Sequence, residues 1–254
     1  RLCGDIPEHL AGAMRSSVFY LAPLLCRVGE VRLPLPGGCK LGPRPVDIHL
    51  AGLAAMGAQV ELEGIAVTLR RRGPLHGVDF ALRLPSVGAT MTLMMAATQA
   101  GGTTILRGAA CEPEICDLAN FLRACGAHIT GAGTPVVVIQ GGKPLQGTAW
   151  TPLPDRIAAA TYAAALACAG GEVTVTGCAP AYYAAFLDFL QAAGVEMTRQ
   201  GDDVTLTRAP AQPLRGRQKL YANAWPAFAT DTAPLAAAVL LAADGPSEIY
   251  DHLF

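Results

Sequence analysis

The chain has few charged residues and few aromatic ones. Of its 254 residues, 15% are Asp, Glu, Lys or Arg and 6% are Phe, Trp or Tyr, whereas 52% are hydrophobic. A chain this apolar can bury a large core, so we expect little of it to be disordered. Its net charge of -1 at pH 7 lacks the positive excess that binding to nucleic acid requires.

The sequence also lacks the spacing of a zinc site and a clear membrane span. No Cys-x-x-Cys or His-x-x-x-His pair occurs, so we expect no metal site. Most of the eight cysteines lie in apolar, Ala-rich stretches and are predicted to be small buried thiols in a reducing cytoplasm. The uncharged residues 84–106 could cross a membrane by length alone, but Gly101-Gly102 and the β-like residues 103–106 predict a buried helix and a strand.

Both ends of the sequence resemble cut points. The chain begins with Arg1 rather than Met and ends at Phe254, directly after a predicted strand. We therefore expect these residues to be an internal piece of a longer chain.

A repeat of roughly 70 residues organises the sequence. One marker recurs as Leu75-His76-Gly77, Leu145-Gln146-Gly147 and Leu214-Arg215-Gly216. A second recurs as Met56-Gly57-Ala58, Cys125-Gly126-Ala127 and Ala193-Gly194-Val195. In the second marker, each glycine follows a predicted amphipathic helix, which is where a left-handed residue commonly ends a helix.

Each repeat is predicted to run helix–strand–helix–strand–strand. The first helices, at 17–26, 89–100 and 158–169, contain no charged residue, and strands follow at 31–33, 103–106 and 172–175. Because these helices are apolar on all sides, we expect them in a shared interior, with the second, amphipathic helices outside against the sheets. The fold class is therefore α/β (α+β), and a fourth unit starts near Phe228 and breaks off.

The domain boundary is expected near residues 153–157, with the segment 209–224 as the alternative. Pro152 and Pro154 favour the first position, because they mark a linker before a new helix. The predicted domains are residues 1–153, with two repeat units, and residues 154–254, with the third unit and the start of the fourth.

The segment 34–49 combines glycines, which allow unusual backbone angles, with prolines that exclude regular helix or strand. Such a hinged loop is typical of lids. Cys39 lies beside Lys40 and five residues before Arg44, and nearby cations lower the pKa of a thiol and make it reactive. The loop is either a catalytic lid or a Gly/Pro loop with an incidental cysteine.

Several polar residues lie where helices are predicted to begin. Asp47, Ser86 and Asp231 can each cap a helix, and the free N–H groups of residues 86–88 can also bind phosphate. Arg15 is either a surface ion-pair partner or a substrate contact. The acidic pair around Pro113 favours a helix dipole. The residues alone leave capping and binding both open.

These motifs resemble those of the bacterial UDP-N-acetylglucosamine enolpyruvyl transferase family. The matching stretches, in order, are Met14–Ser17, Gly37–Asp47, Ser86–Thr90, Glu112–Ile115, Leu153–Arg156 and Thr230–Asp231. The resemblance covers essentially the whole chain, and it implies an inverse α/β barrel of six repeat units in two domains, incomplete here. The related shikimate-pathway enolpyruvyl transferases lack the loop that carries Cys39.

The resemblance implies transfer of the enolpyruvyl group of phosphoenolpyruvate to the 3′-hydroxyl of UDP-N-acetylglucosamine, with release of phosphate, the first committed step of peptidoglycan synthesis. By the same resemblance, Asp231 takes the hydroxyl proton and Arg44 neutralises the phosphate. Cys39 protonates the methylene carbon and is the target of fosfomycin. No cofactor, nucleic acid or membrane is implied, and we expect a monomeric, cytoplasmic full-length protein.

The substrate-binding residues implied are Arg15, Arg44, Pro45, Val46, Asp47, Ile48, Pro85, Ser86, Val87, Gly88, Asp231 and Leu253. Leu84-Pro85 departs from the Lys-Val of many family members, which removes one expected cation near the diphosphate. Two alternatives stay open: a shikimate-pathway enolpyruvyl transferase of the same fold, and a catalytically inactive, nucleotide-binding repeat fragment. We expect this piece alone to turn over little, if at all.

Overall fold

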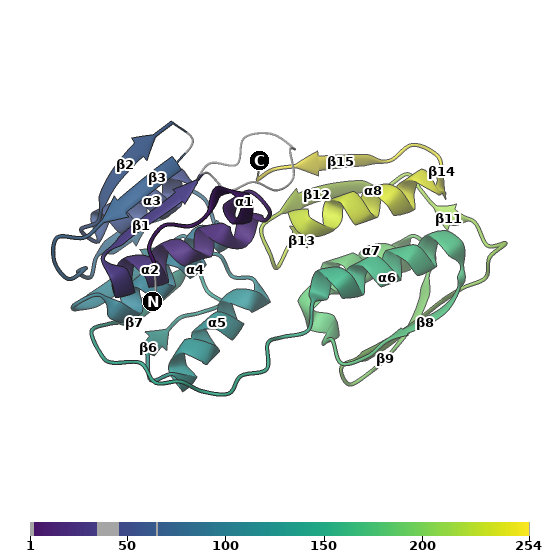
Figure 1. The fold of residues 1–254 in the computed structure, drawn as a ribbon. Helices are drawn as coiled ribbons and strands as arrows, with labels where there is room; N and C mark the ends of the chain where they lie inside the picture. The colour runs from purple at the N-terminus through teal and green to yellow at the C-terminus, as the bar shows by residue number, and fades with distance from the viewer. Residues whose placement is uncertain (1–2, 35–45, 65, 254) are drawn as a thin grey trace. The chain divides into compact units, whose positions relative to one another are not determined.

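The computed structural model describes residues 3–34, 46–64 and 66–253. The chain divides into two compact units, residues 1–150 and 151–254 (Figure 1). Each unit has its own hydrophobic core. Whether these units correspond to the two domains of the family remains a prediction. No helix within the described ranges is long and apolar enough to cross a membrane.

The first unit contains two copies of one pattern, preceded by α1 (Glu8–Ala11) and the 3-10 helix η1 (Arg15–Tyr20). The first copy is α2 (Leu21–Val28), β1 (Glu30–Pro34), α3 (Asp47–Ala55), β2 (Gln59–Glu63) and β3 (Ala66–Arg70), followed by the short β4 (Asp79–Ala81). The second copy is α4 (Val87–Gln99), β5 (Thr103–Arg107), α5 (Pro113–Ala124), β6 (His128–Thr130) and β7 (Val136–Gln140).

The second unit contains the third copy and the start of another. The third copy is α6 (Arg156–Ala169), β8 (Gly171–Val175), η2 (Pro180–Tyr183), α7 (Ala184–Ala192), β9 (Glu196–Gln200) and β10 (Asp203–Arg208). After it come β11 (Leu214–Arg215), β12 (Lys219–Asn223), β13 (Phe228–Ala229), η3 (Thr230–Thr232), α8 (Ala233–Leu241), β14 (Ala243–Asp244) and β15 (Glu248–Asp251). The predicted order of elements is confirmed in all three copies.

The three complete copies each form a sheet of the same topology. Their strands are ordered β1-β3-β2, β5-β7-β6 and β8-β10-β9, so the last strand of each copy lies in the middle and pairs antiparallel with both others. Two parallel pairs extend the pattern to the next copy, β4 with β5 and β12 with β15. Mixed helix and sheet is therefore shown, while the closed inverse barrel stays a prediction.

The helix–glycine marker ends the second helix of each copy in the same way. Gly57, Gly126 and Gly194 have φ angles of 102°, 103° and 102°, a conformation that strains residues with a Cβ. The N–H of the residue after each glycine donates to a carbonyl five residues back, as in a Schellman motif. This marker is therefore a helix stop set by local backbone chemistry.

The Leu-x-Gly marker ties each copy together. The N–H groups of His76, Gln146 and Arg215 donate to the carbonyls of Met56, Cys125 and Ala193, at 3.0, 2.8 and 2.9 Å. The following glycines differ, however. A Cβ on Gly77 or Gly216 would lie 2.2 or 2.0 Å from a backbone oxygen of the next copy, whereas one on Gly147 would meet nothing within 4 Å. The marker at Gly147 stands where the first unit ends.

The predicted interior position holds for α4 and fails for one face of α6. The helix α4 contacts α2, α3, α5 and η1, and most of its residues are buried. The helix α6 contacts α7 and α8, but Ile157 and Tyr162 remain 37% and 67% exposed, and Leu241 of α8 is 90% exposed. The prediction is wrong for this face, because no described element of the second unit covers it.

The cysteines are also less buried than predicted. Of the seven in the described residues, all are free, Cys125 and Cys178 are buried, and Cys3 and Cys168 are exposed. Burial raises the pKa of the Cys26 thiol to about 11, although Arg71 opposes the shift. The apolar sequence around a cysteine therefore did not determine its burial, because the exposed face of α6 is itself apolar.

Candidate functional site

The start of α4 is built as the sequence predicts. Ser86 is the N-cap, and its hydroxyl accepts a hydrogen bond from the N–H of Ala89 at 3.3 Å. The N–H groups of Val87 and Gly88, in the first turn, have no acceptor within the helix. They point out of the helix end, where the helix dipole favours an anion. Pro85 precedes this turn.

The start of α3 differs from the sequence prediction. Val46 occupies the N-cap position, and Asp47 is the first helical residue and forms no capping bond. The Asp47 carboxylate instead accepts hydrogen bonds from the guanidinium of Arg83, at 2.9 and 3.2 Å. The capping interpretation is therefore wrong for Asp47, because a guanidinium offers the carboxylate two charged donors. Val46 and Ile48 are buried in the core.

Arg83 is a residue that the sequence reasoning missed. It lies two positions before Pro85, and its pairing with Asp47 joins the segment before α4 to the start of α3. Both side chains are about half exposed, so the pair itself contributes only about 0–1 kcal/mol to stability. Arg83 directly precedes Leu84-Pro85, where the resemblance led us to expect a cation. This position was the sequence signal that could have identified Arg83.

Next to this start of α4 lies His49, a buried residue of α3. His49 is 4% exposed, and a Cβ placed on Gly88 would lie 2.8 Å from its Nε2 atom. Burial first, and then the positive charge of Arg15, the first residue of η1, lower the pKa of His49 to about 4. Arg15, Asp47 and residues 86–88 therefore belong to one region of the first unit, where η1 and α3 both contact α4.

The second unit places Asp231 beside an arginine rather than at a helix cap. Asp231 lies inside η3, and α8 begins after Thr232, which occupies the N-cap position. Asp231 Oδ2 accepts a hydrogen bond from Nη2 of Arg156 at 3.0 Å. The capping interpretation of Asp231 is therefore wrong, because the carboxylate is engaged by this side chain.

Arg156 is positioned by the start of α6. Asp155 caps that helix, accepting hydrogen bonds from the N–H groups of Ile157 and Ala158 at 2.8 and 3.0 Å. Arg156 is thus the first helical residue, and its side chain is 5% exposed against 48% for Asp231. The pair holds Oδ2 of Asp231 in place. A carboxylate held in this way can accept a hydrogen bond from a hydroxyl.

The remaining predicted residues fall in different places. Cys39, Arg44 and Pro45 lie outside the described residues, so their roles stay predictions. Leu253 follows β15, and its N–H donates to Asp251 Oδ1 at 2.8 Å.

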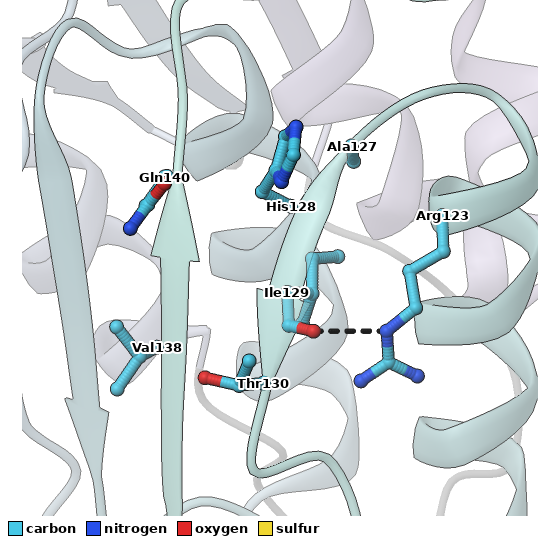
Figure 2. Close-up of a pocket in the computed structure, with 7 residues that line it drawn as sticks. All are labelled: Arg123, Ala127, His128, Ile129, Thr130, Val138 and Gln140. Carbon is cyan, nitrogen blue, oxygen red and sulfur yellow. Dashed lines mark hydrogen bonds between the residues drawn. The ribbon is translucent and has the colours of Figure 1, made fainter.

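Each unit has a hollow among its described residues. The larger of these two, of about 260 Å³, lies against the edge strand β6 and is lined by no predicted site residue (Figure 2). Arg123 in its wall donates from Nε to the Ile129 carbonyl at 2.9 Å. The smaller, of about 70 Å³, is lined by Arg156 and by Thr232, the neighbour of Asp231. The smaller hollow is therefore the one beside candidate chemistry.

No group of three or more His, Cys, Asp or Glu side chains that could hold a metal ion occurs in the described part of the chain. The candidate chemistry rests on helix N–H groups, arginines, a buried histidine and one carboxylate.

The chain is similar to known proteins along nearly its whole length. The family model described as EPSP synthase (3-phosphoshikimate 1-carboxyvinyltransferase) matches residues 4–253. A UDP-N-acetylglucosamine 1-carboxyvinyltransferase of Cellvibrio japonicus is 42% identical over 98% of this chain and 59% of the relative. UDP-N-acetylglucosamine 1-carboxyvinyltransferase 1 of Symbiobacterium thermophilum is 44% identical over 98% of this chain and 56% of the relative. The chain thus spans less than two thirds of these relatives.

Solved structures give the same picture of the fold. The enolpyruvyl transferase NikO of Streptomyces tendae superposes with a TM-score of 0.79 at 25% identity, covering 99% of this chain and 60% of NikO. An EPSP synthase of Acinetobacter baumannii superposes with a TM-score of 0.61 at 21% identity, covering 92% of this chain and 54% of that protein. The second likeness is evidence for the fold alone.

Proposed function

Because the chain belongs to the EPSP synthase family, we propose that its protein transfers the enolpyruvyl group of phosphoenolpyruvate to the 3′-hydroxyl of UDP-N-acetylglucosamine and releases phosphate. The observation that carries this proposal is the identity of about 42% with proteins named for that reaction, over 98% of the chain. On this proposal the protein acts in peptidoglycan synthesis in the bacterial cytoplasm, as a monomer, without metal or organic cofactor.

The proposed chemistry needs one proton removed and one delivered. Asp231 accepts the proton of the 3′-hydroxyl as its oxygen bonds to C2 of phosphoenolpyruvate, and Cys39 protonates the methylene carbon C3. The resulting intermediate then loses phosphate and a C3 proton, which restores the enol double bond. Arg44 neutralises the phosphate in both steps. The hydrogen bond from Arg156 supports this role of Asp231, since it orients the carboxylate.

The nucleotide is proposed to bind along the first unit, with Leu253 adding an apolar contact. The N–H groups of Val87 and Gly88, with Arg15, would hold the diphosphate. Arg44–Ile48 would hold the uridine, as in the family that the motif resembles. Arg83 supplies a cation near Leu84-Pro85, where many family members have lysine.

The rival function is transfer to a shikimate-type acceptor, since the matching family model is described by that activity. The two are separated by measuring phosphate release from phosphoenolpyruvate by the intact protein, with either UDP-N-acetylglucosamine or shikimate 3-phosphate as acceptor. We expect turnover with the first acceptor alone. Turnover with shikimate 3-phosphate alone would reverse the assignment, and nucleotide binding without turnover on either acceptor would identify an inactive protein.

The Cys39 loop is tested by its reactivity. With limiting iodoacetamide, we expect Cys39 to be alkylated before the seven described thiols, and fosfomycin to block that labelling. Cys26, Cys111, Cys116 and Cys178 should react slowly, because burial raises the pKa of each thiol. The exposed Cys3 and Cys168 are the sharper controls. Peptide mapping that finds Cys39 labelled no faster than these two would contradict an activated thiolate.

A further inference from the structure

The hollow against the edge strand β6 is lined by polar side chains from three segments of the first unit (Figure 2). Ile129 in the middle of β6 is buried, so His128 and Thr130 on either side of it face outwards. His128 lies opposite Gln140 of β7, and Arg123 reaches the edge of β6 from α5. No carboxylate occurs among the seven described residues that line this hollow.

Arg123 is held in place without being neutralised. Its Nε donates to the Ile129 carbonyl at 2.9 Å, and its Nη1 donates to Oδ1 of Asn120 at 2.6 Å. These bonds use two of the five N–H donors of a guanidinium, and both acceptors are uncharged. Arg70 and Arg107 are each paired with a carboxylate, whereas Arg123 forms no such pair among the described residues. The guanidinium is therefore fixed at the strand edge with its charge unbalanced.

A second cation lies beside the ring of His128. Nζ of Lys143 is 3.0 Å from Nε2 of that ring. Because an ammonium group can only donate, Nε2 is the acceptor, and the proton of the neutral ring is on Nδ1. His128 therefore carries an N–H donor at Nδ1, and the charge of Lys143 adds to that of Arg123 at this edge of the sheet.

We propose that this hollow is a binding site for a phosphate group, either free phosphate or the phosphate of a small phosphomonoester. The guanidinium of Arg123 supplies the charged fork, and the side chains of His128, Thr130 and Gln140 supply uncharged donors. The oxygens of a phosphate point to the corners of a tetrahedron, which suits donors that come from a helix and two strands. The hollow's volume of about 260 Å³ is several times the roughly 30 Å³ share of one water molecule, so it has room for a phosphate and attached atoms.

This site is separate from the proposed function and does not depend on it, since none of the residues implied for substrate binding lines it. The alternative is that Arg123 only protects the edge of β6, by occupying a carbonyl that another strand could otherwise pair with. The two differ in whether the exposed donors beside Arg123 respond to phosphate.

The resonances of ¹⁵N-labelled histidine in the intact protein make this test local. Without ligand, His128 should be protonated on Nδ1. On titration with inorganic phosphate its Nδ1 resonance should shift and reach saturation, whereas the resonance of the exposed His76 should stay fixed. Sodium chloride and sodium acetate at the same ionic strength are the controls. An unchanged His128 resonance overturns the proposal, and so does an equal shift with either control salt.

Three variants then assign the affinity measured by this titration. Because hydrogen bonds to charged groups are the stronger ones, we expect Arg123→Gln to weaken phosphate binding about tenfold or more. Arg72→Gln removes the same charge at an exposed position after β3 and should weaken binding less than about twofold. Lys143→Gln leaves the bonds of Arg123 intact, and we expect a loss of about threefold or more.

The variants can overturn the proposal in two ways. Equal losses for Arg123→Gln and Arg72→Gln would show only a general effect of net charge. A lower melting temperature for Arg123→Gln with unchanged phosphate affinity would show that Arg123 only protects the strand edge. If Arg123→Gln fails to fold, Lys143→Gln decides, and unchanged affinity in that variant overturns the proposal.

The same titration with glycerol 3-phosphate separates the two sources of the phosphate group. Tighter binding than that of inorganic phosphate identifies a phosphomonoester as the ligand, and equal or weaker binding identifies free phosphate. Both results agree with the proposal. The proposed function is decided by turnover of phosphoenolpyruvate, so either conclusion can fail while the other stands.

Discussion

The helices α4 and α6 begin successive copies of one repeat, yet their N-terminal ends carry opposite polar arrangements. At α4, Ser86 caps the helix, and the buried His49 beside Gly88 has no hydrogen-bond partner among the described residues. At α6, Asp155 caps the helix, and the buried Arg156 is paired with Asp231. One end leaves donors open for an anion, and the other uses a cation to hold a carboxylate.

The same two helices also differ in how they are covered. The helix α4 is enclosed by other elements of its unit, whereas α6 and α8 contact one another and expose an apolar face. A repeated backbone pattern therefore specifies neither the chemistry at a helix end nor the burial of the helix. Both depend on which side chains from distant copies arrive beside it.

The largest expected effect is at Asp231, whose carboxylate is held by Arg156 at the start of α6. In the intact protein, Asp231→Asn keeps size and can still accept a hydrogen bond from Arg156, but it cannot accept a proton. Loss of a general base typically slows a reaction by about 10²–10⁴-fold, so kcat should fall by that amount while melting temperature and nucleotide affinity change little. Phosphate release beside a thermal melt measures this.

Asp244→Asn, an exposed position on β14, is the control and should leave turnover unaltered. Turnover of Asp231→Asn within a few-fold of the wild type would mean that the Arg156–Asp231 pair is structural, and the contrast between the two helix ends would lose its chemical meaning.

Because α4 is enclosed and α8 is exposed, we expect two leucines in these helices to differ widely in their contribution to the unfolding free energy. Leu93 of α4 is fully buried, whereas Leu241 of α8 is 90% exposed. In the 254-residue chain, Leu93→Ala should cost about 2–5 kcal/mol of unfolding free energy, and Leu241→Ala should stay within about 0.5 kcal/mol of zero. Urea denaturation measures both. An equal loss at both positions would show that a further surface covers α8 in solution.

The buried His49 ring, beside the start of α4, predicts that the stability of the folded chain depends on pH. The pKa of His49 is about 4 in the folded chain and 6.5 ordinarily, so the unfolded chain binds the proton more readily. The contribution of the neutral ring is fully present above pH 6.5 and is lost as pH falls towards 4, by about 3 kcal/mol in total.

His49→Leu should remove this part of the acid destabilisation, and His128→Leu should not. The measurement is urea denaturation of the wild type and both variants between pH 7.5 and pH 4, at ~0.5-unit steps. Parallel pH profiles for the wild type and His49→Leu would refute a buried neutral ring.

The smallest expected effect sharpens the comparison between copies. A Cβ at Gly77 would collide with backbone atoms of Thr103, whereas one at Gly147, at the same position of the marker, would meet nothing. We expect Gly77→Ala to cost about 1–3 kcal/mol and Gly147→Ala to be neutral or to stabilise by up to about 1 kcal/mol. Thermal melts of both variants give the answer. Equal changes in melting temperature would show that Gly77 and Gly147 have the same structural role.

Much of the fold was predictable because its signals are local. The three glycines after the second helices adopt nearly equal positive φ angles, and the hydrogen bonds around them lie within six residues of sequence. The helix start at Ser86, with its hydroxyl at the N-cap, was also predicted. Here one residue type in one backbone conformation is sufficient to determine the local structure.

The candidate site was predictable only in part. Three aspartates stand at predicted or actual helix starts, and the sequence gives each the same capping signal. Asp155 caps its helix, whereas Asp47 pairs with Arg83 and Asp231 pairs with Arg156, 36 and 75 residues away.

The outcome at each helix start is a competition between nearby N–H groups and a distant guanidinium. A charged, two-pronged donor prevails wherever the fold brings one within reach. The local sequence shows the nearby N–H groups, but it does not show which distant guanidinium competes with them. The packing of His49 against Gly88, the pairing of Arg156 with Asp231 and the exposed face of α6 were therefore decided by the tertiary structure, because each depends on atoms that meet only after the copies have packed together.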